Sequence, residues 1–433
     1  MNKKGFAVTG IIYSILILFL ILVFSVLSIL GSRKLVLDKL KNDVANKLNN
    51  EVEAPTIIYK DAILDGNDPV LDNGLIPVVY DVDKWVVADV SKAWYDYTSK
   101  QWANAIIVNA NKKADYIAGT AVLEEDVLAY MVWVPRYEYH FDTNKIGTDK
   151  NKPGAIDIKF TKSSTATSGY IMHPAFTFDN KQLNGLWVGK FETTGTVEKP
   201  TIKPNNVSLT NQNVSTQFNT AQIFNTYGLT NADSHMMKNT EWGAVAYLTQ
   251  SIYGRCVSET SCEEVTINNI NTDMASSYAG SITGCAGDTV SAGMVRSATC
   301  PDTNKYQTLK GMKASTTGNI TGIYDMSGGT YEYVMGNFNK TIGNSGFSGM
   351  PAAKYFDLYT ISTSINGDAT NAENTNGFYG DDANFTNVDK PWFMRGGNYA
   401  YFGIAGIFAF YNYTGEGYGN FGFRITFTNL TLK

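Results

Sequence analysis

A stretch of 25 residues without a charge, from Phe6 to Leu30, limits the places in which this chain can fold. At a rise of about 1.5 Å per residue, a helix over this stretch exceeds the roughly 30 Å hydrocarbon core of a bilayer. The stretch is longer than the apolar core of a secretory signal peptide, and no small-residue cleavage site follows it. The sequence therefore predicts a helix that spans a membrane.

An amphipathic helix is expected to continue from this span. Apolar residues recur at spacings of three, four and four from Leu37 to Leu48, among Lys, Asp and Asn, so they share one helix face. Pro55 ends the pattern, because its nitrogen carries no proton and its ring clashes with the preceding turn. We therefore expect residues 1–54 to form one anchor helix.

A very short basic leader, Met1–Gly5, precedes Phe6 at the start of the apolar stretch. This arrangement resembles the N-terminus of a type IV pilin or pseudopilin. The resemblance implies cleavage between Gly5 and Phe6, and self-assembly into a pilus-like fibre. The family uses a glutamate at the fifth mature residue for assembly, whereas Gly10 stands there in this chain. A plain anchor helix that is neither cut nor polymerised is therefore the alternative.

The basic residues around the apolar stretch give an ambiguous orientation. Two lysines precede it, and Arg33 with four lysines follows it before residue 48. The positive-inside rule applied to this count puts the C-terminal part in the cytoplasm. We place that part outside the cell instead, because of the pilin-like leader and the cysteine pattern. The expected location is the cell surface, with a membrane anchor and an extracellular head.

All four cysteines lie within 45 residues that are rich in Gly, Ser, Thr and Asn. Four cysteines allow three pairings, and chain order favours Cys256 with Cys262 and Cys285 with Cys300. The spacing lacks the Cys-x-x-Cys pairs that structural zinc sites use. Disulfides persist in oxidising compartments, which agrees with an extracellular head.

Residues 55–126 are expected to form a small β module that spaces the head from the anchor. Short runs of β-branched and aromatic residues alternate there with turn residues. The expected strands are residues 76–80, 85–87 and 105–108. In the expected head, residues 127–433, strands are predicted at 130–134 and 186–192, and a helix at 240–248 with Thr240 as its N-cap.

Several segments of the head follow one known pattern. They are LWVGKFETT at 186–194, NTEW at 239–242, GIYDMSGGTYEY at 322–333, Arg-Gly-Gly at 395–397 and Gly-Phe-Arg at 422–424. In order and spacing they resemble the formylglycine-generating-enzyme/sulfatase-modifying family. The resemblance implies a C-type-lectin-like head. The expected fold class is therefore α+β, with a pilin-like helix, a small β module and a lectin-like head.

Two departures from that family bear on function. Its enzymes place copper-binding cysteines between the last two motifs, but residues 395–424 contain none. Since that chemistry needs thiolate ligands, we expect no enzyme activity and no cofactor. The asparagine that binds calcium in some members corresponds to Gly329, while Glu332 is kept. Calcium therefore stays open as a ligand.

Ten of the 25 residues from Tyr399 to Phe423 are aromatic, and only Glu416 is charged. Phe408, Phe410 and Phe423 have strand-like spacing and are expected in the core. The tyrosines and asparagines of the glycine-rich turns are harder to bury, because each needs a hydrogen-bond partner. Such residues on a rigid scaffold are typical of binding loops. We expect ligand contacts from Tyr399, Tyr401, Phe402, Ile404, Tyr411, Asn412, Tyr413, Tyr418 and Asn420.

The same segment resembles the variable region of target proteins of diversity-generating retroelements. That resemblance implies a lectin-like fold whose contact residues vary by adenine-directed mutagenesis. The alternative is an ordinary aromatic core with a few exposed tyrosines. We therefore expect a surface-displayed, adhesin-like protein that binds a protein or glycan ligand. A structural pilin subunit and a divergent enzyme without the family cysteines are the alternatives.

The charge balance argues against nucleic acid as a partner. The chain has 35 Lys and Arg against 40 Asp and Glu, a net charge of −5. A basic excess that could neutralise a phosphate backbone is therefore missing.

Overall fold

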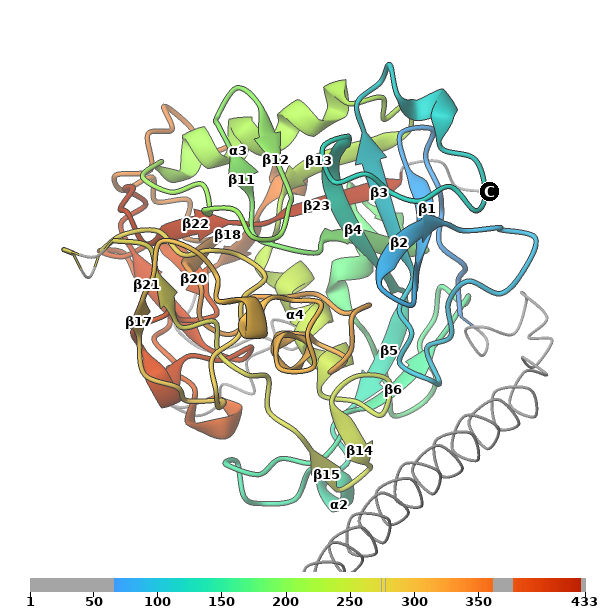
Figure 1. The fold of residues 1–433 in the computed structure, drawn as a ribbon. Helices are drawn as coiled ribbons and strands as arrows, with labels where there is room; N and C mark the ends of the chain where they lie inside the picture. The colour runs from blue at the N-terminus through green and yellow to red at the C-terminus, as the bar shows by residue number, and fades with distance from the viewer. Residues whose placement is uncertain (1–65, 274, 277, 361–376, 430–433) are drawn as a thin grey trace, which may run out of the picture. The chain divides into compact units, whose positions relative to one another are not determined.

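The computed structural model describes residues 66–360 and 377–429, except 274 and 277, and most of its regular structure is strand (Figure 1). The expected anchor helix, with the span Phe6–Leu30 and the cleavage point between Gly5 and Phe6, lies outside these residues. Within them, no helix is long and apolar enough to cross a membrane. The sheet-rich α+β class expected for the head is confirmed.

The larger sheet has seven strands among the described residues, in the order β13-β23-β10-β4-β3-β1-β2, and all neighbours are antiparallel. Its central strands are buried along nearly their whole length, so the predicted apolar runs fill the core. Trp133 and Trp187 pair across two of these strands, with ring centres 5.3 Å apart. The strands are β1 (Ile76–Asp81), β2 (Lys84–Val87), β3 (Asn104–Val108), β4 (Val127–Pro135), β10 (Gly185–Gly189), β13 (Ala232–Met236) and β23 (Ile425–Asn429).

The strands expected for a separate spacer are present, but they belong to this same sheet. β3 pairs with β4 at five positions, from Asn104 opposite Val132 to Val108 opposite Val127. Residues 58–433 accordingly form one compact unit. The boundary expected at residue 126 is therefore corrected. β3 lies between β1 and β4 in this sheet, so the strands of residues 76–108 continue the sheet of the head.

The second sheet is built around β18 (Tyr331–Phe338). Its order is β19-β18-β20-β21, and β22 also pairs with β18. β22 runs parallel to the first residues of β18, and β21 runs antiparallel to β20. The C-terminal aromatic segment therefore completes this sheet. The other strands are β19 (Asp357–Tyr359), β20 (Trp392–Arg395), β21 (Phe410–Tyr413) and β22 (Phe421–Phe423).

The chain passes from the second sheet to the first at Arg424, between β22 and β23. Its guanidinium donates to both carboxylate oxygens of Glu332 on β18 and to the Gly189 carbonyl on β10, the last at 2.8 Å. Glu332 and Arg424 are both fully buried. This ion pair therefore ties the two sheets together behind the aromatic segment.

The predicted helix is α4 (Asn239–Thr249), and nearly every residue of it is buried. Its N-cap is Lys238 rather than Thr240. The Lys238 N–H donates to the Glu241 carboxylate at 2.9 Å, so an acid in the first turn holds the helix start. The Thr240 N–H donates instead to Asp357 at 2.7 Å, because Thr240 already lies inside the helix.

The remaining regular elements are short. The helices are α2 (Thr143–Ile146) and α3 (Val214–Gln222). The strands are β5 (Tyr137–His140), β6 (Asp157–Phe160), β7 (Ile171–Met172), β8 (Thr177–Phe178), β9 (Lys181–Gln182), β11 (Thr194–Gly195), β12 (Pro200–Thr201), β14 (Cys256–Ser258), β15 (Ser261–Cys262), β16 (Ile270–Asn271) and β17 (Val295–Arg296).

Two disulfides pair the cysteines as chain order favoured. One joins Cys256 to Cys262 across β14 and β15, and the other joins Cys285 to Cys300. The second bond packs with Ile270 and Ile282 in a small apolar cluster. It therefore supplies part of the core of a segment that has little regular structure.

Candidate functional site

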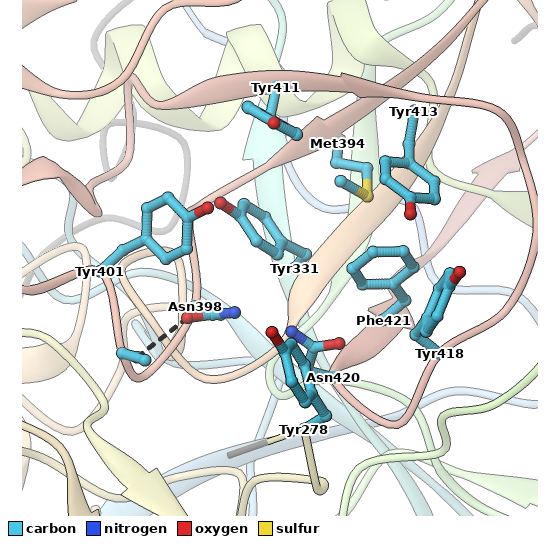
Figure 2. A pocket seen from close by; sticks show the side chains of 11 residues that line it. Tyr278, Tyr331, Met394, Asn398, Tyr401, Tyr411, Tyr413, Tyr418, Asn420 and Phe421 are labelled. Carbon is cyan, nitrogen blue, oxygen red and sulfur yellow. Dashed lines mark hydrogen bonds between the residues drawn. The ribbon is translucent and has the colours of Figure 1, made fainter. Parts of the chain in front are cut away.

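A pocket with a volume of about 580 Å³ opens on the second sheet, and Figure 2 shows its lining. Seven of the 11 described lining residues are aromatic. The lining is Tyr278, Tyr331, Met394, Asn398, Ala400, Tyr401, Tyr411, Tyr413, Tyr418, Asn420 and Phe421. Its volume falls in the range of about 300–1,000 Å³ that is usual for ligand pockets.

Strand pairing explains why the rings gather there. Residues opposite each other in register project to the same face of a sheet. Tyr331 on β18 is opposite Phe421 on β22, and Met394 on β20 is opposite Tyr411 on β21. Tyr413 lies two residues beyond Tyr411 and so faces the same way. The sheet thus forms an aromatic floor from segments far apart in the sequence.

Five of the nine expected contact residues line the pocket. They are Tyr401, Tyr411, Tyr413, Tyr418 and Asn420. Phe402 and Ile404 lie outside it, in one 3-10 turn that follows Tyr401, and their side chains are 48 % and 44 % exposed. A Cβ on Gly293, in the Cys285–Cys300 loop, would stand 3.4 Å from the Phe402 ring. These two residues therefore form a rim beside that loop.

Two expected contact residues are buried and face away from a ligand. Asn412 lies between Tyr411 and Tyr413 on a strand, so it projects to the opposite face, where its amide donates to the Phe385 carbonyl. The Tyr399 side chain is fully buried, and its hydroxyl donates to the Ala279 carbonyl at 2.7 Å. We correct both positions: they support the site rather than contact a ligand.

Sequence reasoning missed six positions of the lining: Tyr278, Tyr331, Met394, Asn398, Ala400 and Phe421. Tyr331 opens a strand in the GIYDMSGGTYEY motif, and its alternation with Tyr333 could have indicated a shared face. Asn398 directly follows the Arg-Gly-Gly motif. Met394 and Tyr278 carry no such signal, because their place depends on how distant segments pack. Tyr278 comes from the loop between β16 and β17 and is 71 % exposed.

Two asparagine amides provide polar groups at the pocket. Asn420 is only 6 % exposed, and its Oδ1 has no hydrogen-bond partner in the described part of the chain. Asn398 Oδ1 accepts the Ala400 N–H at 2.9 Å, and Figure 2 shows its amide nitrogen directed among the lining side chains. The accessible surface of the Asn420 Oδ1 is below 1 Å², so a ligand in the pocket does not reach it unless its neighbours move.

Two tyrosines of the pocket, Tyr331 and Tyr413, have raised pKa values and so keep their hydroxyl protons. The neighbouring Tyr418 hydroxyl, together with burial, raises the pKa of Tyr413 to about 12. Burial, and then the Tyr401 hydroxyl, raise the pKa of Tyr331 above its ordinary value. These phenols therefore act as neutral hydrogen-bond donors and acceptors at physiological pH.

Charged side chains stay outside the lining. None of the described residues that line the pocket carries a formal charge. The Lys390 ammonium lies 5.5 Å from the centre of the Tyr411 ring, and the Glu416 carboxylate accepts the Tyr418 hydroxyl at 3.4 Å. Lys390 and Glu416 thus lie beside the pocket, while its described lining is neutral.

The two positions that match the family's calcium pattern, Gly329 and Glu332, do not offer a free side-chain oxygen to a cation. Both carboxylate oxygens of Glu332 are bonded to Arg424, and Gly329 has no side chain that could bind a cation. The described residues contain no group of three or more His, Cys, Asp and Glu placed to hold a metal ion. Burial raises the pKa of Glu332 to about 7, while Arg424 acts in the opposite direction. This carboxylate therefore serves the link between the sheets.

The arrangement provides ring stacking and neutral hydrogen bonds. The described lining has no carboxylate, imidazole, thiol or amine, which are the groups that most often act as bases and nucleophiles. The described lining thus offers ring faces, phenols and amides to a ligand.

No protein-family model matches this chain, and no curated protein matches it. Among solved structures the chain is similar to Treponema denticola variable protein 1, with 10 % identity and a TM-score of 0.31, over 70 % of this chain and 97 % of that one. It is also similar to PvdO from Pseudomonas aeruginosa, with 11 % identity and a TM-score of 0.30, over 69 % and 94 %. Both similarities are too low to support a function, so the function is inferred from the residues of this chain.

Proposed function

We propose that this protein is an adhesin-like, ligand-binding protein of the cell surface, whose aromatic pocket and rim contact a protein or glycan without catalysis. One observation carries the proposal. Five of the residues expected from a single aromatic-rich segment, 401–420, line one pocket of ligand size. Tyr418 in the lining, and Phe402 and Ile404 beside it, are each at least 40 % exposed. Exposed aromatic and apolar groups around a pocket are typical of an interaction site.

The proposed location at the cell surface is inferred from the N-terminal sequence and the cysteines. The uncharged stretch from Phe6 to Leu30 would anchor the chain in a membrane. The two disulfides favour an oxidising compartment for the head. The proposal therefore includes an extracellular head on a pilin-like helix.

The C-type-lectin-like fold and the diversified segment belong to the same proposal. They rest on the motifs between residues 186 and 424 and on the aromatic content of 399–423. A reverse-transcriptase gene beside this one, with a nearby copy of the region encoding 395–424 that differs mainly at adenines, would support diversification. If the genome has neither the gene nor the copy, the proposal of diversification fails and the proposal of ligand binding is unaffected.

The test uses intact cells that display the full-length chain. Such cells are applied to arrays of extracellular proteins and glycans, and protease is added from outside to ask whether the head is accessible. We expect binding that a Tyr401→Ala/Tyr418→Ala variant loses and that Tyr80→Ala keeps, since Tyr80 is a half-exposed tyrosine on β1 of the other sheet. A head sealed from protease, or equal binding by the pocket variant, would overturn the proposal.

A further inference from the structure

Residues 66–75 lead from the expected anchor into β1, and none of them belongs to a helix or a strand. We propose that this segment, called the strap from here on, is a mechanical clamp that keeps a pull on the anchor from reaching the large sheet. The inference rests on the proposed function, because a head is pulled only when it is anchored at one end and holds a ligand at the other.

The sequence of the strap, GNDPVLDNGL, disfavours a further strand of the sheet. Gly, Asn and Asp are depleted in strands, and Pro69 has no N–H to donate to a neighbouring strand. Half of the ten residues are nevertheless buried, so their polar backbone groups need partners. Side chains of the head supply several of these partners.

Two tryptophans hold the first half of the strap to the centre of the large sheet. The Trp133 indole on β4 donates to the Asn67 carbonyl at 3.2 Å, and the Trp187 indole on β10 donates to the Val70 carbonyl at 2.8 Å. β4 and β10 are neighbouring strands. An indole N–H only donates, so a carbonyl of the strap is the kind of partner that each buried tryptophan needs.

Side chains of the strap itself add two attachments. The Asn67 amide donates to the Thr161 carbonyl, directly after β6, at 2.8 Å. The Asp68 carboxylate accepts the Tyr95 hydroxyl, from the connection between β2 and β3, at 2.5 Å. The strap is therefore bonded to segments that are far apart in the sequence.

Asp72 makes the attachment nearest to β1. Its two carboxylate oxygens accept the backbone N–H groups of Thr230 and Asn231, just before β13, at 2.8 and 2.7 Å. The Asp72 side chain is buried, and hydrogen bonds to a carboxylate are stronger than those between neutral groups. This attachment therefore closes the strap at its C-terminal end.

The order of these attachments along the chain places them between the anchor and β1. Tension from the anchor meets Asn67 first and reaches Ile76, the first residue of β1, only after the bonds of Asp72 have broken. β1 pairs with both β2 and β3, so tension there would open the large sheet. Survival under load depends on the rate of unfolding, which rises when bonds that break before the transition state are removed. The strap bonds should therefore set the lifetime of the loaded head.

The test pulls the full-length protein at constant force in detergent micelles. One handle is attached between residues 33 and 54, and the other at the position of Ile404, which is exposed beside the pocket. Tyr95→Phe keeps the ring and loses the bond to Asp68, so we expect it to shorten the lifetime under load roughly fivefold. Asp72→Ala loses two bonds to a carboxylate and should shorten it by about tenfold or more.

Tyr170→Phe is the matched control for Tyr95→Phe. The Tyr170 hydroxyl also donates to an aspartate, Asp157, at 2.5 Å, but both residues lie outside the strap. We expect this variant to lose as much equilibrium stability in chemical denaturation as Tyr95→Phe and to keep the lifetime of wild type under load.

The outcomes separate this inference from the proposed function. Lifetimes like that of wild type for Tyr95→Phe and Asp72→Ala would overturn the inference. An equal shortening by Tyr170→Phe would overturn it as well, because the lifetime would then follow overall stability. If Asp72→Ala does not fold, Tyr95→Phe and its control decide. The proposed function is judged separately, by ligand binding to cells, which variants of the strap should leave unchanged.

Discussion

Replacing Cys285 and Cys300 with serine is predicted to lower the free energy of unfolding by about 3 kcal/mol. The bond closes a loop with a sequence separation of 15, and both cysteines are buried. Without it, the unfolded chain regains the conformational entropy of that loop, which for this length corresponds to the value above. The other disulfide, with a separation of six, gives about 2 kcal/mol by the same relation.

The assay is chemical denaturation of the full-length protein in detergent, followed by tryptophan fluorescence. Three proteins are compared: wild type, Cys285→Ser/Cys300→Ser, and Cys256→Ser/Cys262→Ser as the matched control with the shorter loop. The first variant should lose more stability than the control. Because the Phe402 ring lies beside Gly293 in this loop, amide exchange around Phe402 should also become faster.

Two results would refute this reasoning. A loss below about 1 kcal/mol for the 285–300 variant would mean that closing the loop does not restrict the unfolded chain. A larger loss for the 256–262 control would show that local packing, rather than loop length, decides the stability.

Three further predictions concern the second sheet. Arg424→Met should destabilise the protein by about 3–5 kcal/mol in a denaturation experiment, because it leaves the buried Glu332 without its partner; a loss under about 1 kcal/mol would contradict this. Burial raises the pKa of Glu332 from 4.5 to about 7. Its contribution to stability is therefore complete below pH 4.5 and is lost as the pH rises to 7. Relative to Glu332→Gln, the free energy of unfolding of the wild type should fall as the pH rises over that interval, and parallel pH curves would refute it. Asn412→Ala should lower stability by about 1 kcal/mol through its lost hydrogen bond to Phe385 and leave ligand binding unchanged; weaker binding would return Asn412 to the contact set.

Strand positions and the disulfide pairing could be predicted because they depend on neighbouring residues. β1, β4 and α4 lie where apolar periodicity placed them, β10 covers the first part of the predicted strand 186–192 and ends at Gly189, and the cysteines pair in chain order. The extent of the head could not be predicted in this way. β3 pairs with β4, which follows it in the chain only after a long connection, and local periodicity does not show that pairing.

In the candidate site, too, the sequence predicts the segment involved, and only the structure shows which of its residues face the pocket. Composition indicated the segment that contains Tyr401, Tyr411 and Tyr413, since ten aromatic residues in 25 far exceed the average. It could not separate Asn412 from its two neighbours, because that depends on whether residues 410–413 are a turn or a strand. The structure makes them a strand, and alternate residues then point to opposite faces.

The sequence by itself determined the uncharged stretch near the N-terminus, the main strands and the aromatic-rich segment, because composition and periodicity are properties of adjacent residues. Only the tertiary structure decided which of those aromatic residues share a pocket and that Tyr278 and Tyr331 join them. Strand register and the approach of distant loops set these positions, and both arise from packing across the whole head.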